Sequence, residues 1–193
     1  NNMGGDIQRI VLSEGGIVSV TGKEKDNYQT NIRMSGGGIL IEKGCHLLSQ
    51  LCYILDETPI RVRKAVIEYQ GELDVDVHAE MIAPHGTKTI PIVFDISNIR
   101  SLKPLIRIEG KNSALEFNPQ SANDPPVICS LSTGDRVPLT PLSTSPKNYT
   151  QAFYLKWDAF LSSVASKTKM NTRKTTSVMV TDIISSLYER TRD

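Results

Sequence analysis

The chain has 193 residues, 39% of them hydrophobic and 22% charged, with a formal net charge of +1 at pH 7. This composition excludes a disordered chain and predicts one globular domain, residues 1–193, large enough to bury a core. The near-neutral charge excludes a global electrostatic footprint for nucleic acid, and no apolar run is long enough for a transmembrane helix.

The amino-terminal part contains weak strand patterns and one glycine-rich turn. Residues 7–20 predict a short hairpin or two edge strands, and residues 28–34 alternate as a strand. The three glycines at 36–38 predict a turn that feeds a short strand at residues 39–40. A phosphate-binding loop is the alternative, but no Gly-Lys-Ser/Thr follows.

One amphipathic helix is predicted in the first third of the chain. Between His46 and Leu55, apolar residues recur at spacings of three and four, and Pro59 limits the helix at its end. We predict a core helix that packs across a sheet, with a partner-binding helix as the alternative. An odd number of cysteines and the lack of a secretory signal predict a reducing compartment.

A long pair of strands follows, broken at Gly71. Residues 61–69 and 73–81 both alternate with period two. The second strand places apolar residues on one face, and the solvent face carries Glu72, Asp74, Asp76 and Glu80. His78 shares that face, so a cation site or an acid/base pair is the alternative to a solvated acidic face. No second segment supplies converging ligands, so we predict no catalytic residue, no metal and no cofactor.

The middle of the chain predicts more antiparallel strands and one long loop. Residues 89–96, 105–108 and 114–117 are strand-like, whereas residues 118–150 predict a surface loop rich in Pro, Ser and Thr, with only 127–131 strand-like. The predicted fold class is α+β. It consists of a mainly antiparallel sheet of five to seven strands, one amphipathic helix packed across it, and C-terminal helices.

The C-terminal part combines aromatic, basic and helical segments. Residues 153–164 predict a strand in the first half and a helix in the second; residues 177–180 predict a strand and 182–190 a final helix. A basic loop at 167–174 lies between them. We predict contact with anionic lipid or RNA through Lys167, Lys169, Arg173, Lys174, Arg61 and Arg63. A solvated loop is the alternative.

Two segments resemble the matrix proteins of rhabdoviruses: residues 38–69, with their strand, helix and strand, and the aromatic residues 155–160. The resemblance implies a non-enzymatic viral structural protein that self-associates and links a nucleocapsid to the inner face of a membrane. Its implied partners are itself, through the acidic face, nucleocapsid protein or RNA, and an anionic membrane surface, with no small-molecule substrate. The implied locations are the virion, the host cytoplasm, the inner face of the host membrane and the nucleus.

A second resemblance concerns the cell-to-cell movement proteins of plant viruses. The apolar strand Ile90–Asp95, followed by Arg100, is similar to a signature in their jelly-roll core. This alternative implies binding of single-stranded nucleic acid. An enzyme ranks third, because the chain has three histidines, no glycine-framed serine and no histidine–cysteine arrangement. The sequence therefore predicts a protein that is not an enzyme.

Overall fold

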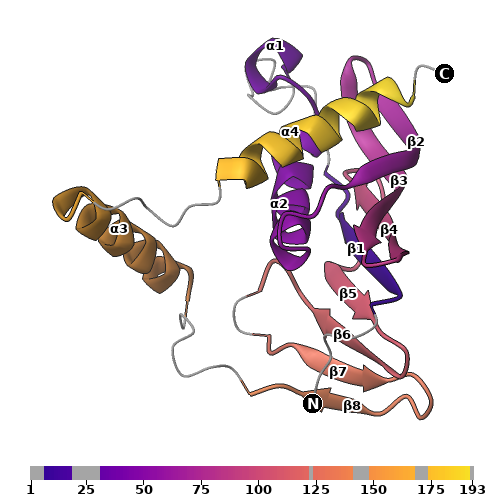
Figure 1. Ribbon diagram of the computed structural model, residues 1–193. Helices are drawn as coiled ribbons and strands as arrows, with labels where there is room; N and C mark the ends of the chain where they lie inside the picture. Colours follow the sequence, from indigo (N-terminus) through magenta and orange to yellow (C-terminus); the bar gives the residue numbers. More distant parts are fainter. Residues whose placement is uncertain (1–6, 19–30, 122–123, 141–147, 168–173, 192–193) are drawn as a thin grey trace.

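One eight-stranded sheet organises the computed structural model of the chain (Figure 1). The structure describes residues 7–18, 31–121, 124–140, 148–167 and 174–191. The strands lie in the order β2-β3-β4-β1-β5-β6-β7-β8. Their bounds are β1 (Arg9–Gly15), β2 (Arg61–Gln70), β3 (Leu73–His85), β4 (Lys88–Ser97), β5 (Leu105–Glu109), β6 (Ser113–Phe117), β7 (Val127–Ser130) and β8 (Arg136–Pro138).

The first strand lies in the middle of this sheet. β1 pairs in parallel with β4 and antiparallel with β5, and every other pairing is antiparallel. Ile10 and Leu12 are fully buried. The hairpin predicted for residues 7–20 is therefore wrong, because the partners of β1 lie about ninety residues away in the chain, where local alternation carries no information.

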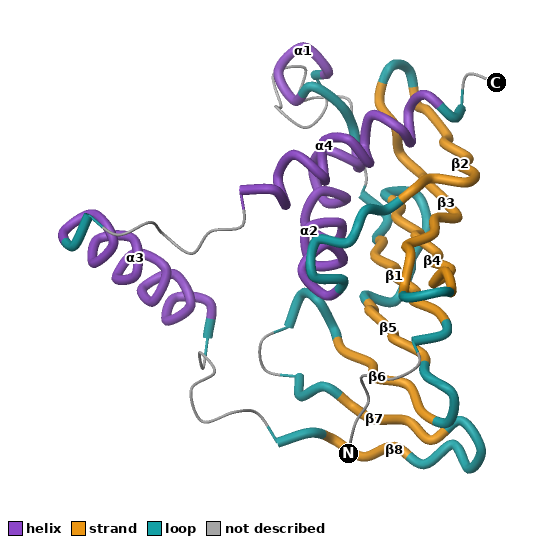
Figure 2. Tube along the Cα trace, in the orientation of Figure 1, coloured by secondary structure: helices purple, strands orange, loops and turns teal. Residues whose placement is uncertain are grey.

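The described residues contain the helical segments α1 (Ile32–Ser35), the π-helix η3 (Leu40–Gly44), α2 (Cys45–Ile54), α3 (Tyr149–Ala165) and α4 (Lys174–Glu189). Of these, η3, α2 and α4 share one hydrophobic core with the sheet. Figures 1 and 2 show α2 and α4 crossing over the sheet, while α3 stands apart. The strands predicted at residues 39–40, 177–180 and the first half of 153–164 are wrong, because all three segments are helical. No helix of the described ranges is long and apolar enough to span a membrane.

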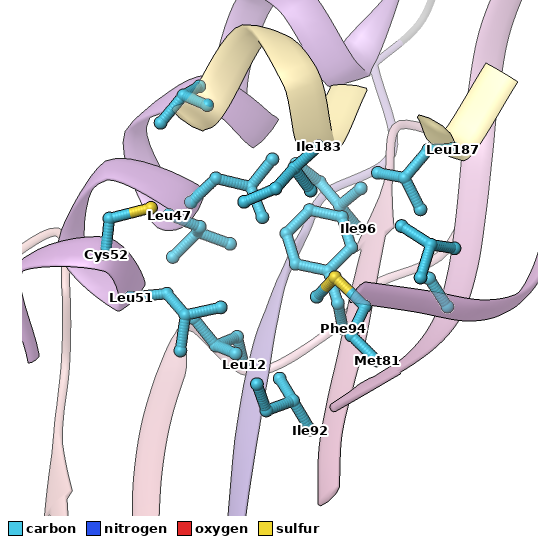
Figure 3. Packing of buried hydrophobic residues seen from close by; sticks show 14 of the residues in the cluster. Leu12, Leu47, Leu51, Cys52, Met81, Ile92, Phe94, Ile96, Ile183 and Leu187 are labelled. Carbon is cyan, nitrogen blue, oxygen red and sulfur yellow. The ribbon is translucent and has the colours of Figure 1, made fainter. Parts of the chain in front are cut away.

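The predicted core helix is confirmed. Its apolar face is buried through Leu47, Leu48, Leu51 and Cys52. Figure 3 shows the Phe94 ring of β4 enclosed by side chains from α2, α4 and β3. The helix ends at Ile54, before Pro59 as predicted, and Asp56 and Glu57 adopt φ angles of 50° and 58°. These left-handed residues turn the chain toward β2.

The α+β class and the mainly antiparallel sheet are confirmed, but the sheet has eight strands rather than five to seven. β7 coincides with the strand-like residues 127–131, whereas β8 lies in the part of residues 118–150 that the sequence predicts as loop. Pro138 is the last residue of the edge strand β8. A proline is tolerated at such an edge because its missing N–H removes no bond from the ladder.

The face away from α2 carries paired charges on β5, β6 and β8. Arg107 donates hydrogen bonds to Glu109 and Glu116, and Arg136 Nη2 donates to Glu116 Oε2 at 2.7 Å. Glu116 is buried, with 7% of its surface exposed. Burial would raise the pKa of Glu116, but the hydrogen bonds from Arg136 and Arg107 outweigh it and hold the pKa below the ordinary 4.5.

A change of Glu116 to glutamine is expected to alter the acid stability of the fold. Because the folded-state pKa lies below the unfolded one, the carboxylate stabilises the fold above pH 4.5, and this contribution is lost as the pH falls through the lowered pKa. We expect Glu116→Gln to reduce the free energy of unfolding at pH 7 by about 1–3 kcal/mol. Urea unfolding between pH 3 and pH 7 measures this, with the exposed Glu80→Gln as control. A variant with wild-type acid dependence would refute this role.

Candidate active site on the π-helix

Polar side chains gather where η3 joins α2. One side of this segment is buried through Leu40 and Gly44. Glu42 and Lys43 are half-buried on the other side, and His46 is exposed in the first turn of α2. The spacing of four between Glu42 and His46 places them on successive turns of one side. π-Helices are rare and frequently occur at functional sites.

A close approach of two backbones fixes the start of this segment. Gly38 N–H donates to Asp74 Oδ1 at 2.7 Å, and Leu40 N–H donates to Asp74 Oδ2 at 2.8 Å. A Cβ atom on Gly38 would lie 2.0 Å from the carbonyl oxygen of Asp74. Only glycine therefore lets the chain enter η3 against β3.

Asp74 departs from the solvated acidic face predicted for β3, since only 2% of its surface is exposed. In the β2–β3 register, Glu68 pairs with Asp76 but Tyr69 pairs with Asp74, so Val75 is skipped. Such a bulge breaks the alternation and re-aims the side chain beside it. It turns Asp74 toward the helices, where it holds the glycine turn.

The third bond to Asp74 comes from α4. Tyr188 Oη donates to Asp74 Oδ1 at 2.8 Å. Burial and then the bond to the Asp74 carboxylate raise the pKa of Tyr188 above its ordinary value of 10. Tyr188 therefore stays a protonated donor throughout the physiological range, and Asp74 joins β3, the glycine turn and α4.

Removing the Tyr188 hydroxyl is expected to destabilise the protein. Tyr188→Phe leaves one bond fewer on a buried carboxylate, which we expect to lower the free energy of unfolding by about 1–3 kcal/mol. Denaturant unfolding followed by circular dichroism measures the change. Tyr154→Phe is the matched control, because Tyr154 is 73% exposed. Equal stability of both variants would show that the bond contributes nothing.

A second contact fixes η3 to the end of β4. Lys43 Nζ donates to Asn98 Oδ1 at 3.1 Å, and Asn98 N–H donates to the Val75 carbonyl at 2.8 Å. Asn98 thus lies beside the bulge, directly after β4. The site combines an imidazole, a carboxylate, an ammonium group and an amide. An imidazole exchanges protons near neutral pH, and the other groups can hydrogen-bond hydroxyl or carbonyl oxygens.

The remaining residues of the predicted acidic face lie elsewhere. Asp76 accepts three hydrogen bonds from Arg100, at 2.7–3.0 Å. His78 Nδ1 lies 2.8 Å from Asp95 Oδ1, while Glu72 and Glu80 are exposed. Asp76 and His78 point away from the core face of β3, so they are not part of the π-helix site. Within the described ranges, no three His, Cys, Asp or Glu side chains could hold a metal.

Among the residues that the structure describes, no hydrogen bond or ion pair brings the predicted anion-binding residues together. Arg61 and Arg63 are exposed on β2, and Lys167 is exposed just after α3. Lys169 and Arg173 lie outside the described residues, and Lys174 is the first residue of α4. Contact with an anion through these residues stays a prediction.

Comparisons with solved structures show which known proteins share the fold of this chain. No family model matches the sequence, and no curated protein matches it. Aldose–aldose oxidoreductase from Caulobacter crescentus, solved with glycerol, matches 97% of this chain with a TM-score of 0.75 and 19% identity. This chain therefore shares the fold of the matched part of that enzyme. An NAD-binding oxidoreductase from Klebsiella pneumoniae matches 98% at TM-score 0.72 and 12% identity, and levoglucosan dehydrogenase, solved with NADH and levoglucosan, matches 98% at 0.71 and 14%.

The chain spans just over half of these oxidoreductases, namely 54%, 57% and 58% of their lengths. The likeness corrects several predictions. The resemblances to a viral matrix protein and a jelly-roll movement protein are wrong, as is the prediction of a non-enzyme, because the structural neighbours are oxidoreductases. The predicted nucleocapsid and membrane partners and the predicted lack of a small-molecule substrate are also wrong, since these neighbours bind NAD(H), glycerol or levoglucosan. Self-association through the acidic face stays a prediction. A single domain over residues 1–193 stays a prediction.

The glycine turn at residues 36–38 does not fit a dinucleotide. Dinucleotide pyrophosphates bind where a glycine-rich turn presents free N–H groups at the start of a helix, after a strand of a parallel unit. In the 36–38 turn, the N–H groups of Gly38 and the nearby Leu40 are already taken by Asp74. A dinucleotide would have to be held outside these residues.

Proposed function

We propose that this chain is the substrate-binding and proton-transferring part of an oxidoreductase that acts on a hydroxyl-bearing small molecule, a sugar or polyol. The observation that carries the proposal is the exposed His46 in the first turn of α2, directly after the π-helix, on a fold shared with sugar oxidoreductases. Glycerol and levoglucosan, bound to two of the structural neighbours, are hydroxyl compounds.

The arrangement supports the proton side of an alcohol–carbonyl interconversion. Oxidation of an alcohol carbon releases a hydride and the hydroxyl proton; a nicotinamide dinucleotide held outside this chain would supply the hydride acceptor. Neutral His46 accepts the hydroxyl proton as general base and returns it in the reverse direction. Glu42, one turn earlier, favours the imidazolium that forms. Lys43 and Asn98 offer hydrogen bonds that orient the substrate oxygens.

The test is a hydride-transfer assay of the chain together with a dinucleotide-binding domain, joined to it or supplied as a separate polypeptide. NAD⁺ and NADP⁺ are each tested with a panel of aldoses, anhydrosugars and polyols, and reduced dinucleotide is followed by absorbance. We expect turnover of at least one member of the panel. Binding of sugars to the assembled protein is measured in parallel by calorimetry. Neither turnover nor sugar binding across the panel would overturn the proposal.

A further inference from the structure

α3 is an unusual surface helix. Of its 17 residues, only Lys156 and Asp158 are charged. Large apolar side chains are exposed along it by 42–73% of their surface, namely Phe153, Tyr154, Leu155, Trp157, Phe160, Leu161 and Val164. A helix that faces water on its own normally carries a polar face. Figures 1 and 2 show no described element lying against α3.

The apolar residues of α3 form an organised surface. Trp157, Phe160, Leu161 and Val164 recur at spacings of three and four, which places them on one side of the helix. The Trp157 and Phe160 rings meet edge to face with centroids 5.7 Å apart. Together with Phe153 and Lys156 they line an open cavity of about 300 Å³. Aromatic side chains around such a cavity are typical anchors of a protein interface.

The length of the structural neighbours indicates what covers this surface. The matches span 97–98% of this chain, so most of the 17-residue α3 belongs to the shared fold. Since the match takes in 54–58% of each neighbour, the other 42–46% of its length lies beyond the match. The N–H groups of Gly38 and Leu40 in the glycine turn are taken by Asp74, so this turn does not hold a dinucleotide. A dinucleotide-binding domain would account both for the unmatched length of the neighbours and for a cofactor site outside this turn.

We propose that the apolar side of α3, centred on Trp157 and Phe160, is the docking surface for the dinucleotide-binding domain of the enzyme. This proposal rests on the proposed function. Docking there removes the apolar stripe from water and fixes the second domain against the chain that carries His46. Two aromatic anchors in a stripe with few charges fit the core of a permanent interface, which is depleted of charged residues.

Trp157 is the only tryptophan of the chain and reports directly on this surface. The chain is studied alone and together with the dinucleotide-binding domain of the enzyme, joined to it or as a separate polypeptide. Any tryptophan of that domain is replaced by phenylalanine. We expect the emission of Trp157 to shift to shorter wavelength in the assembly and its quenching by acrylamide to fall several-fold. The proposal is overturned if the emission of Trp157 is unchanged in the assembly and acrylamide quenches it as strongly as in the chain alone. It is also overturned if the emission of the chain alone shifts to shorter wavelength with rising concentration, which would mean that a second copy covers α3.

Substitutions on the two sides of α3 provide the matched comparison. Leu161→Asp and Val164→Asp place a charge within the apolar stripe, and each is expected to weaken assembly more than tenfold. Ser162→Asp, on the opposite side of α3, is expected to leave assembly unchanged. Circular dichroism confirms folding of each variant. Turnover with a buried Trp157 supports both proposals. Turnover with an exposed Trp157 overturns only the docking surface, and a buried Trp157 without turnover or sugar binding overturns only the proposed function.

Discussion

Replacing Gly38 with alanine adds a single methyl group and is expected to destabilise the protein strongly. The added Cβ would lie 2.0 Å from the Asp74 carbonyl oxygen and 2.7 Å from its backbone nitrogen. Both atoms belong to the backbone of β3, so no side-chain rotation relieves the clash. Separating the two backbones would also break the two hydrogen bonds that Asp74 accepts from the glycine turn. We expect the free energy of unfolding to fall by about 4 kcal/mol or more.

Denaturant unfolding of Gly38→Ala measures this loss, with Gly16→Ala as the matched control. Nothing lies within 4 Å of a Cβ at Gly16, and its φ is not positive. The control is expected to keep wild-type stability within about 0.5 kcal/mol. If Gly38→Ala fails to fold at all, Gly38→Ser should fail as well while Gly16→Ser folds. A Gly38→Ala protein as stable as the control would contradict the close approach to Asp74.

Replacing His46 with glutamine is expected to remove most of the activity without unfolding the protein. His46 is exposed, so the fold loses little packing. Loss of a positioned general base lowers kcat by roughly 10²–10⁴-fold. Glutamine keeps hydrogen-bonding capacity but takes up no proton. We therefore expect KM for the sugar to change much less than kcat.

The control for His46 is His85→Gln, at the exposed end of β3. That variant is expected to keep wild-type kcat and KM. In the wild-type protein, the fall of kcat/KM toward low pH reports protonation of the base. We expect this fall to be absent from the pH profile of His46→Gln. A His46→Gln enzyme with an unchanged rate and pH profile would remove His46 from the site.

The sequence predicts those elements whose evidence is local. The spacing of Leu47, Leu48 and Leu51 defines α2, and the period-two alternation defines most of β2 and β3. The entry into α2 is missed because Ile39 and Leu40 form a short apolar pair after glycines, which is typical of a strand. The helical spacing in fact continues backward from Leu47 through Gly44 to Leu40, a signal that the glycine hides.

Asp74 and β1 could not be predicted, for a different reason. The bulge that re-aims Asp74 depends on the register between two strands, which no residue of β3 reveals alone. The place of β1 in the centre of the sheet depends on partners far along the chain. Glu42, Lys43, His46 and Asn98 form no recognisable motif in sequence, since Asn98 meets Lys43 only through the fold.

The incorrect functional predictions have a similar origin. An order of strand, helix and antiparallel strands is common to many α+β folds, so a resemblance of order selects no function. The apolar stripe of α3 is visible in the sequence, but its exposure is visible only in the structure. The basic residues around 167–174 predict a charged binding surface, whereas the unusual surface of the structure is the exposed apolar side of the neighbouring helix α3.

The central claim is that His46 meets the substrate hydroxyl, and nuclear magnetic resonance of the three histidines tests it most directly. Ring ¹⁵N and ¹H signals of His46, His78 and His85 are followed in the assembled enzyme as the sugar with the highest turnover is added with its dinucleotide. We predict that the His46 ring signals shift, while those of His78 and His85 stay in place. An unmoved His46 in a saturated enzyme, with the shift at His78 instead, would contradict the π-helix site and place substrate on the opposite face of the sheet.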